Sequence, residues 1–217
     1  VGSSNFKART GKVLLFGGEG SQNYNDTWVF DQRTTKWTFI DSPPNTQSPL
    51  GRGGHAMAAL GEGKALLFGG HDYLDTKYEY LNYTWIFEQT TNVWTKIPTL
   101  KQPTARVGHA MASFGEQVLL FGGVHGNSVT SGQGYLGDTW MFNQRTNDWL
   151  LLAITSSPLA RNDHAMASLE KSNKVLLFGG ADYNGNYLDD AWTFDSSKNK
   201  WNKVDTKASP SPRYLHA

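Results

Sequence analysis

A short apolar block recurs four times in the chain, at intervals of slightly more than 50 residues. It reads Val-Leu-Leu-Phe-Gly-Gly in three copies and Ala-Leu-Leu-Phe-Gly-Gly in the fourth. A fixed period of this length is typical of chains that repeat one supersecondary unit, each unit burying its apolar face against a neighbour. The fold is therefore constrained to four similar units. Their phenylalanines are Phe16, Phe68, Phe121 and Phe178, with spacings of 52, 53 and 57 residues.

Two further motifs share this period. The first is Arg-x-x-His-Ala, which begins at Arg52, Arg106, Arg161 and Arg213. The second is a pair of tryptophans nine residues apart, and it uses all 8 tryptophans of the chain. The pairs are Trp28/Trp37, Trp85/Trp94, Trp140/Trp149 and Trp192/Trp201.

Each unit contains four short segments with β-strand character: His-Ala-Met-Ala or its equivalent, the apolar block, the segment at the first tryptophan, and the segment at the second. Clusters of Gly, Asn, Asp, Ser and Pro separate them, which is the composition of turns. This pattern predicts an all-β protein, a β-propeller of four-stranded antiparallel blades. The tryptophans are expected to be core residues that fill the gap between adjacent blades.

The apolar strand that ends in Gly-Gly, followed by two aromatic residues at a set distance, resembles the kelch repeat. The resemblance covers nearly the whole chain and implies a kelch-type propeller. Propellers of this family serve as substrate adaptors, cytoskeletal binders, extracellular modules and, more rarely, enzyme scaffolds. In kelch adaptors, the arginine at the position of Arg52, Arg106, Arg161 and Arg213 lines the ligand pocket and reads acidic peptides.

The motifs divide residues 1–217, taken as a single domain, into repeats at about 1–48, 49–102, 103–157 and 158–211. The first repeat has no Arg-x-x-His motif of its own, whereas residues 212–217 carry one with nothing after it. Either 212–217 completes the first blade of a four-bladed ring, or the chain is part of a larger propeller. A third possibility is that two chains associate and cover each other's exposed strand edges.

Composition excludes several classes of function. The chain has 217 residues, 38% of them hydrophobic, and a formal net charge of +1, so the overall charge does not favour nucleic acid. No apolar stretch approaches the roughly 20 residues that span a bilayer, so membrane insertion is not expected. The absence of cysteine excludes thiolate metal sites, as well as the cysteine–tyrosine cofactor of the copper radical oxidases that use a similar propeller. The sequence does not indicate a cellular location.

Strand parity predicts which face of the blades binds a partner. The start of the first strand, the end of the second and the start of the third lie on the same side of a four-stranded antiparallel blade. The four arginines and the variable loops between Gly-Gly and the first tryptophan therefore share one face, and loops on a rigid frame commonly carry specificity. The candidate contact residues are Arg52, Arg106, Arg161, Arg213, Tyr73, Tyr78, Tyr83, His125 and Tyr183, with Glu79, His71 and Asn127 beside them.

No catalytic motif accompanies this arrangement, so we expect neither enzymatic activity nor a cofactor. The histidines of the Arg-x-x-His motifs are predicted to face the packing between blades rather than to hold a metal. The leading hypothesis is a binding or scaffold module for a protein or peptide, with an acidic partner among the expected ones. The alternatives are a carbohydrate-binding or surface-adhesion module and the propeller scaffold of a larger enzyme.

Overall fold

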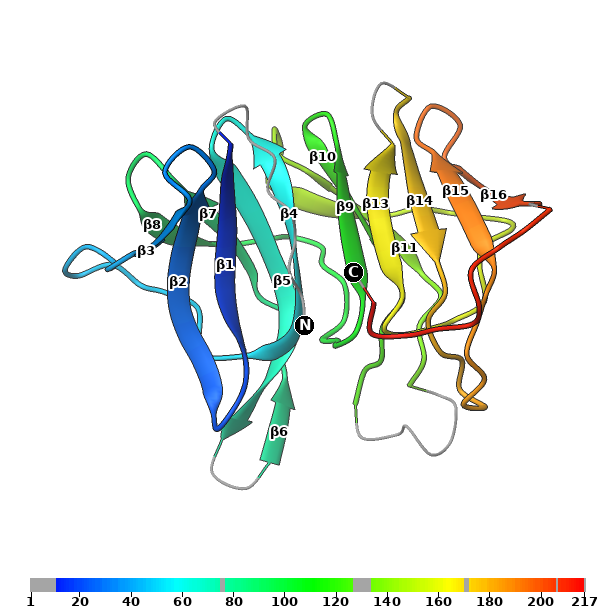
Figure 1. Ribbon diagram of the computed structural model, residues 1–217, viewed down its shortest axis with the longest axis horizontal. Coiled ribbons are helices and arrows are strands. Elements are labelled where there is room, and N and C mark those ends of the chain that lie inside the picture. The colour runs from blue at the N-terminus through cyan, green and yellow to red at the C-terminus, as the bar shows by residue number, and fades with distance from the viewer. Residues whose placement is uncertain (1–10, 75–76, 127–133, 170–171, 206, 217) are drawn as a thin grey trace.

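The computed structural model describes residues 11–74, 77–126, 134–169, 172–205 and 207–216, and these form four antiparallel sheets (Figure 1). The sheets have strand orders β1-β2-β3, β4-β5-β7-β8, β9-β10-β11-β12 and β13-β14-β15-β16. A short extra strand, β6, pairs with the end of β5. The predicted all-β kelch-type architecture is confirmed, and we call the four sheets blades 1 to 4.

The strands are short, and each blade's strands fall within one sequence repeat. Their bounds are β1 Lys12–Glu19, β2 Asn23–Asp31, β3 Lys36–Phe39, β4 Gly53–Gly61, β5 Lys64–Leu74, β6 Lys77–Tyr80, β7 Thr84–Glu88, β8 Val93–Ile97, β9 Ala110–Phe114, β10 Gln117–Phe121, β11 Thr139–Asn143, β12 Asp148–Leu151, β13 Ala165–Leu169, β14 Lys174–Phe178, β15 Ala191–Asp195 and β16 Lys200–Val204.

The hydrophobic core is divided into three clusters, one between each pair of neighbouring blades. Side chains alternate between the two faces of a strand, so a strand between two blades must be apolar on both faces. This explains the unbroken Val-Leu-Leu-Phe run. In blade 1, Leu14 and Phe16 are buried against blade 2, whereas Leu15 points away from it and is partly exposed.

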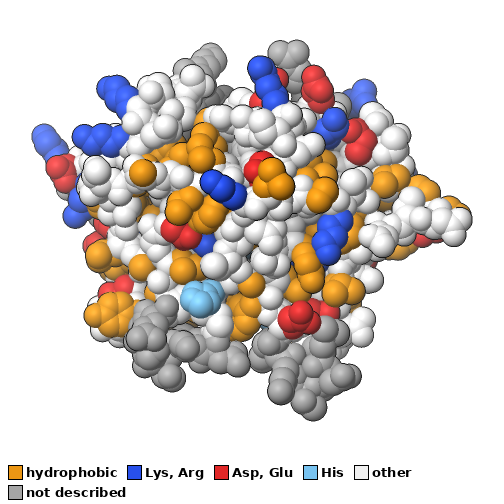
Figure 2. All heavy atoms as spheres, turned by 180° about the vertical axis from the view of Figure 1, so that it is seen from behind, with side chains coloured by type: hydrophobic (Ala, Val, Ile, Leu, Met, Phe, Trp, Pro, Cys, Tyr) orange, Lys and Arg blue, Asp and Glu red, His pale blue; other side chains and the backbone are white. Residues whose placement is uncertain are grey.

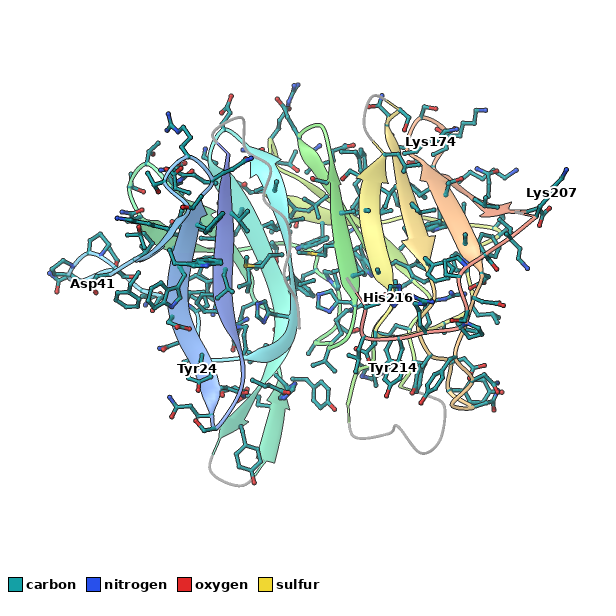
Figure 3. The ribbon with its side chains drawn as sticks, viewed as in Figure 1. Tyr24, Asp41, Lys174, Lys207, Tyr214 and His216 are labelled. Atoms are coloured by element: carbon teal, nitrogen blue, oxygen red, sulfur yellow. The ribbon has the colours of Figure 1, made fainter. Side chains whose placement is uncertain are left out.

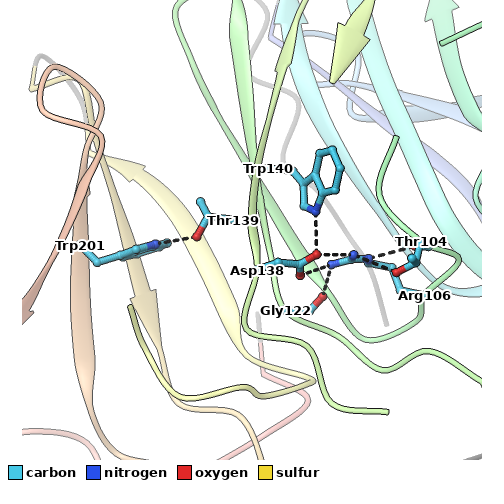
Figure 4. Close-up of polar contacts among 7 residues, drawn as sticks. All are labelled: Thr104, Arg106, Gly122, Asp138, Thr139, Trp140 and Trp201. Atoms are coloured by element: carbon cyan, nitrogen blue, oxygen red, sulfur yellow. Dashed lines mark hydrogen bonds and ion pairs between the residues drawn. The ribbon is translucent and has the colours of Figure 1, made fainter. Parts of the chain in front are cut away.

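The second tryptophan of a pair joins its blade to the blade before it. The indole Nε1 of Trp149 in blade 3 donates to Thr84 Oγ1 in blade 2 at 3.0 Å, and its ring packs edge-on against Phe68 of blade 2. The same bond and the same ring contact join blade 2 to blade 1 and blade 4 to blade 3 (Figure 4 shows the latter bond). We call this contact the tryptophan latch. The latches are Trp94–Thr27, Trp149–Thr84 and Trp201–Thr139.

In blades 3 and 4 the two tryptophans of a pair differ in burial, whereas in blade 2 both Trp85 and Trp94 are buried, which refines the prediction that all are core residues. Trp94, Trp149 and Trp201 are fully buried, while Trp28, Trp140 and Trp192 are only partly buried. Trp37 is 50% exposed because no blade among the described residues precedes blade 1. Burial of a second tryptophan therefore depends on the preceding blade.

Backbone hydrogen bonds link neighbouring blades at the segments that lead into their first strands. The N–H of Gly108 donates to Gly54 O, that of Asp163 to Gly108 O, and that of Leu215 to Asp163 O, at 2.7–3.0 Å. All four residues have positive φ, between 52° and 64°. Each follows the motif arginine by two residues, so the motif sets the link between blades. We call this series of bonds the inner ladder.

The segment Arg213–His216 joins the inner ladder and repeats the contacts that the Arg-x-x-His motif makes before the first strand of the other blades. Arg213 O accepts from Gly180 N at 2.9 Å, as Arg161 O accepts from Gly123 N, and the His216 ring packs edge-on against Phe178. Among the described residues, β1 pairs with β2 alone. Completion of blade 1 by residues 212–217 is therefore not among the observed pairings, and the number of blades in the whole ring stays a prediction.

The motif histidines lie in the packing between blades. The rings of His55, His109 and His164 are almost fully buried, edge-on to the phenylalanine of the preceding blade at 5.6–5.9 Å. The first glycine of Gly-Gly is needed opposite the ring, because a Cβ at Gly69 would stand 2.6 Å from His109 Cε1. In the described part of the chain, no group of three potential metal ligands comes together.

Removal of a latch tryptophan should destabilise the fold in proportion to its burial. Trp149→Ala should lower the free energy of unfolding by about 3–5 kcal/mol, because it opens a cavity and leaves Thr84 without its partner. Trp37→Ala, at the equivalent position in blade 1, should cost far less because half of that side chain is already exposed. Urea unfolding monitored by circular dichroism measures both. Equal losses from the two variants would contradict the latch.

The buried histidines should make stability depend on pH. Burial, and then the positive charge of the nearby motif arginine, lowers the pKa of His55 and of His164 to about 3. In the unfolded chain their pKa is about 6.5, so between these values the unfolded state binds more protons. Stability should therefore be full above about pH 6.5 and decrease as the pH falls. Urea unfolding from pH 8 to pH 4 tests this, and His164→Leu should make the decrease less steep.

Candidate binding face and its arginine clamps

The structure brings the motif arginines and the described parts of the variable loops to one end of the blades, which we call the loop face. It consists of the starts of the innermost strands and the loops between each Gly-Gly and the following tryptophan, and it lies at the bottom of Figure 1. The opposite end carries the tight turns within each blade, and we call it the turn face. Tyr24 and Tyr214 both lie toward the loop face (Figure 3). The variable loops and the motif arginines therefore lie at the same end of the blades, as strand parity predicts.

Three of the four motif arginines are completely buried. Arg52, Arg106 and Arg161 each donate from Nε to the carbonyl two residues earlier and from Nη1 to the carbonyl of the first glycine of Gly-Gly, at 2.9–3.1 Å. Each arginine thereby fastens the start of the first strand to the end of the second within its blade. Their proposed contact with a partner stays a prediction.

In blades 3 and 4 the arginine also binds a carboxylate with both terminal nitrogens. Arg106 Nη1 and Nη2 lie 2.7 and 2.8 Å from Asp138 Oδ1 and Oδ2, and the same Oδ2 accepts from Trp140 Nε1 at 2.6 Å (Figure 4). Arg161 and Asp190 repeat this geometry, with Trp192 as the third member. We call these arrangements the arginine clamps.

The clamp lowers the pKa of its carboxylate. Burial acts to raise the pKa of Asp138, but the hydrogen bonds and charge of Arg106, with the bond from Trp140, outweigh it and hold the pKa below its ordinary value. Asp190 behaves alike through Arg161 and Trp192. Both carboxylates are therefore charged and engaged at neutral pH. Arg106 makes five hydrogen bonds and Arg161 four inside the protein, so every guanidinium nitrogen of both is already engaged.

The clamp is incomplete in blade 2, where Tyr83 stands in place of the aspartate. Arg52 Nη2 and Trp85 Nε1 are buried and have no hydrogen-bond partner among the described residues. Burial lowers the pKa of Arg52 to about 10, and Asp72 and Tyr83 offset only part of that effect, so the guanidinium is still charged at neutral pH. Blade 2 thus holds a buried cation with one guanidinium nitrogen, Nη2, that has no partner among the described residues.

Other predicted contact residues have distinct positions. Tyr73 and Tyr183 are 54% and 59% exposed. Tyr83 is half-buried, and Lys96 Nζ of β8 lies 3.5 Å from the centre of its ring, so this side chain packs against its own blade. Arg213 is exposed and donates to Ser211, while His125 and Glu79 are exposed. His71 Nε2 lies 2.6 Å from Glu19 Oε1. The side chain of Tyr78, and the whole of Asn127, lie outside the described part.

Sequence reasoning missed the clamp aspartates, although a signal for them exists. An aspartate precedes the first tryptophan by two residues in three of the four repeats, at Asp26, Asp138 and Asp190. In each of these three the indole Nε1 donates to that carboxylate. Alignment of the repeats would have shown both the aspartate and its replacement by Tyr83.

The surface seen from behind carries side chains of both charge signs. Seen from behind, acidic, basic and hydrophobic side chains are interspersed over the coloured part of the surface (Figure 2). Within the described part of the chain, no helix is long and apolar enough to cross a membrane.

The repeated blades, latches and clamps define a kelch-repeat propeller domain. Residues 6–217 match the KLHDC2/KLHL20/DRC7 Kelch-repeats domain, so the chain belongs to the kelch-repeat family. Domains of this family generally act as protein-interaction or scaffold modules and are typically non-catalytic.

Several curated proteins are similar to the chain. It is 29% identical to Kelch domain-containing protein 2 of Bos taurus, over 94% of this chain and 54% of that protein. It is 30% identical to Putative adagio-like protein 2 of Oryza sativa subsp. japonica (87% and 30%) and 28% identical to Kelch-like protein 15 of Homo sapiens (87% and 31%). The chain thus spans about half the length of the bovine relative and less than a third of the other two.

Breaking a complete clamp should cost stability. Arg106→Gln leaves Asp138 half-buried without its cation, and loss of one partner from a buried ion pair typically costs about 3–5 kcal/mol. Since Asp138 is partly accessible to water, we expect the lower end of that range. Thermal and urea unfolding measure the change, and Arg145→Gln, which breaks the exposed pair with Glu116, is the matched control with a change near zero. Similar losses from both variants would show that the clamp contributes little.

Proposed function

We propose that the chain is a non-catalytic module that binds a protein or peptide on its loop face. The observation that carries this proposal is a set of large aromatic side chains exposed there. Tyrosine provides a large contact area with little loss of conformational entropy, and it is enriched at recognition surfaces. The exposed tyrosines are Tyr24, Tyr73, Tyr183, Tyr187 and Tyr214.

These tyrosines are presented on loops with internal hydrogen bonds. Asp182 Oδ1 accepts from the N–H groups of Asn184 and Asn186, both at 2.9 Å, which closes the loop that carries Tyr183. Asp72 Oδ1 accepts from the N–H of Tyr73 at 2.8 Å, and the β5–β6 hairpin continues from there. Such preorganisation reduces the entropy that is lost on binding. The hydrogen bonds within these loops therefore support their use as a recognition surface.

The acidic character of the partner is the more detailed part of the proposal, and it rests on Arg52. In blades 3 and 4, the arginine Nη2 and the tryptophan Nε1 converge on one carboxylate oxygen. Arg52 keeps the same bonds to Leu50 and Gly69, so its Nη2 has the corresponding orientation beside Trp85. If the half-buried Tyr83 side chain moves aside, a carboxylate from a partner would satisfy these two buried donors, and charge-assisted hydrogen bonds are stronger than neutral ones.

A peptide library displayed on phage tests the face. Peptides selected on the chain should lose about 10-fold or more in affinity for Tyr73→Ala and for Tyr183→Ala, because anchor aromatics commonly contribute more than 1 kcal/mol. Phe39→Ala is the matched control, since it removes an equally exposed aromatic from the outer edge of blade 1. Fluorescence anisotropy measures the affinities. Binding that only Phe39→Ala weakens, or a glycan array that responds where the library does not, would contradict the proposal.

The substitution Tyr83→Asp tests the acidic partner. It places a carboxylate where Asp138 and Asp190 stand, so it should complete the clamp, keep the fold and exclude the carboxylate of a partner. Peptides selected on the chain should be enriched in Asp or Glu, and those peptides should bind Tyr83→Asp at least about 10-fold more weakly. Tyr83→Phe is the control and should bind them normally. Undiminished binding by Tyr83→Asp would remove Arg52 from the recognition site.

A further inference from the structure

A lysine stands beside the incomplete clamp of blade 2. Lys96 of β8 is the cross-strand partner of Trp85, whose Nε1 has no hydrogen-bond partner among the described residues. The Nζ of Lys96 lies 3.5 Å from the centre of the Tyr83 ring, and Tyr83 occupies the repeat position of the clamp aspartates. Lys96 therefore lies close to the place where blades 3 and 4 hold a carboxylate.

Blade 4 shows what a lysine at this position does. Lys203 of β16 is the cross-strand partner of Trp192, so it is the repeat equivalent of Lys96. Burial acts to raise the pKa of Asp190, but the clamp's hydrogen bonds and the charge of Arg161 lower it, and the charge of Lys203 lowers it further. A lysine at this position thus adds to the attraction that holds the clamp carboxylate.

The Tyr83 side chain must move aside before a carboxylate enters the incomplete clamp. Its ring is half-buried and packs against the core cluster between blades 1 and 2. The contact between Lys96 and this ring is a cation–π interaction, which is weak at an exposed site. Lys96 is exposed, so its ammonium group can leave the ring for a stronger, charge-assisted contact once the ring is displaced.

The charges around the incomplete clamp call for one further negative charge. Arg52 and Lys96 supply two positive charges, and Asp72 supplies one negative charge, which acts on Arg52. A carboxylate brings the sum to zero, whereas a phosphate monoester carries roughly 1.5 to 2 negative charges at neutral pH and would exceed it. The charge balance therefore favours a carboxylate over a phosphorylated side chain.

We propose that Lys96 is a specificity-determining residue of the acidic-partner site, and that it exchanges the Tyr83 ring for the carboxylate of a partner's aspartate or glutamate. Arg52 Nη2 and Trp85 Nε1 donate to that carboxylate from inside the blade, and Lys96 approaches it from the exposed side. The inference rests on the proposed function, because it concerns the same site. It adds a second cation to the site and makes Tyr83 a cover that the partner displaces.

Lys96→Leu tests this role, because blade 3 carries Leu151 at the equivalent position. The probe is an aspartate-containing peptide selected on the chain and amidated at its C-terminus, compared with the same peptide carrying asparagine. Fluorescence anisotropy gives the ratio of the two affinities for each protein. Lys96→Leu should lower this preference for aspartate about 3- to 10-fold. Lys203→Leu is the matched control, since it removes the equivalent lysine beside a filled clamp, and it should leave the preference unchanged.

The same comparison in a Tyr83→Ala background removes the displacement of the ring from the measurement. The aspartate peptide should bind Tyr83→Ala about 3- to 10-fold more tightly than it binds the unaltered chain, because the site is already open. Adding Lys96→Leu should again lower the preference for aspartate, and raised sodium chloride should reduce this effect of Lys96. A peptide with phosphoserine in place of the aspartate should bind no more tightly than the aspartate peptide.

The outcomes separate this inference from the proposed function. If Lys96→Leu leaves the preference for aspartate unchanged while Tyr83→Asp still weakens binding, Lys96 has no role and the Arg52 site stands. An equal effect of Lys203→Leu, or tighter binding of the phosphoserine peptide, would also overturn the inference. If the unaltered chain binds the aspartate and asparagine peptides equally, both the acidic partner and the role of Lys96 are wrong.

Discussion

The tryptophan latch is the contact on which the rest of the structure depends. One indole ring closes the space between two sheets, packs against a phenylalanine of each, and hydrogen-bonds a threonine of the preceding blade. Without this contact each sheet would expose the apolar residues of two faces. Because the latch joins neighbouring blades only, stability is a sum of similar local interfaces, as in other repeat proteins. The loop face can therefore vary while the frame stays constant.

The arginine clamps hold the frame to the loops. Each fastens the loop after the second strand to the start of the first, so the loop face is anchored from inside the blade. Natural variation within this chain shows how the anchor can change: Tyr83 replaces the carboxylate in blade 2, and Asp26 has no clamp arginine among the described residues in blade 1. In both places a group that is satisfied in blades 3 and 4 retains unused hydrogen-bonding capacity. The proposed carboxylate recognition at Arg52 follows from the first of these departures.

Much of this architecture could be predicted from the sequence, because its period is strict and its strands are apolar on both faces. Val-Leu-Leu-Phe could only be a strand buried between two sheets, and strand parity was enough to bring Arg106 to the same end as the variable loops. The roles of Trp140 and Trp149 could not be separated in this way, because their burial depends on contacts with another blade. Nor could the burial of Arg52, since it depends on contacts such as the bond from its Nη1 to Gly69 O at the end of the second strand.

The inner ladder gives the arrangement of blades a direction. Each N–H donates to the carbonyl of the blade before it, so one end of the series offers a donor and the other an acceptor. Blades can therefore join only in one sense, and a reversed or mirror-symmetric junction would place like groups opposite each other. Gene duplication that copies a whole repeat preserves this sense automatically, whereas shuffling part of a repeat does not. Growth of such a protein by whole repeats is thus a consequence of hydrogen-bond polarity as well as of packing.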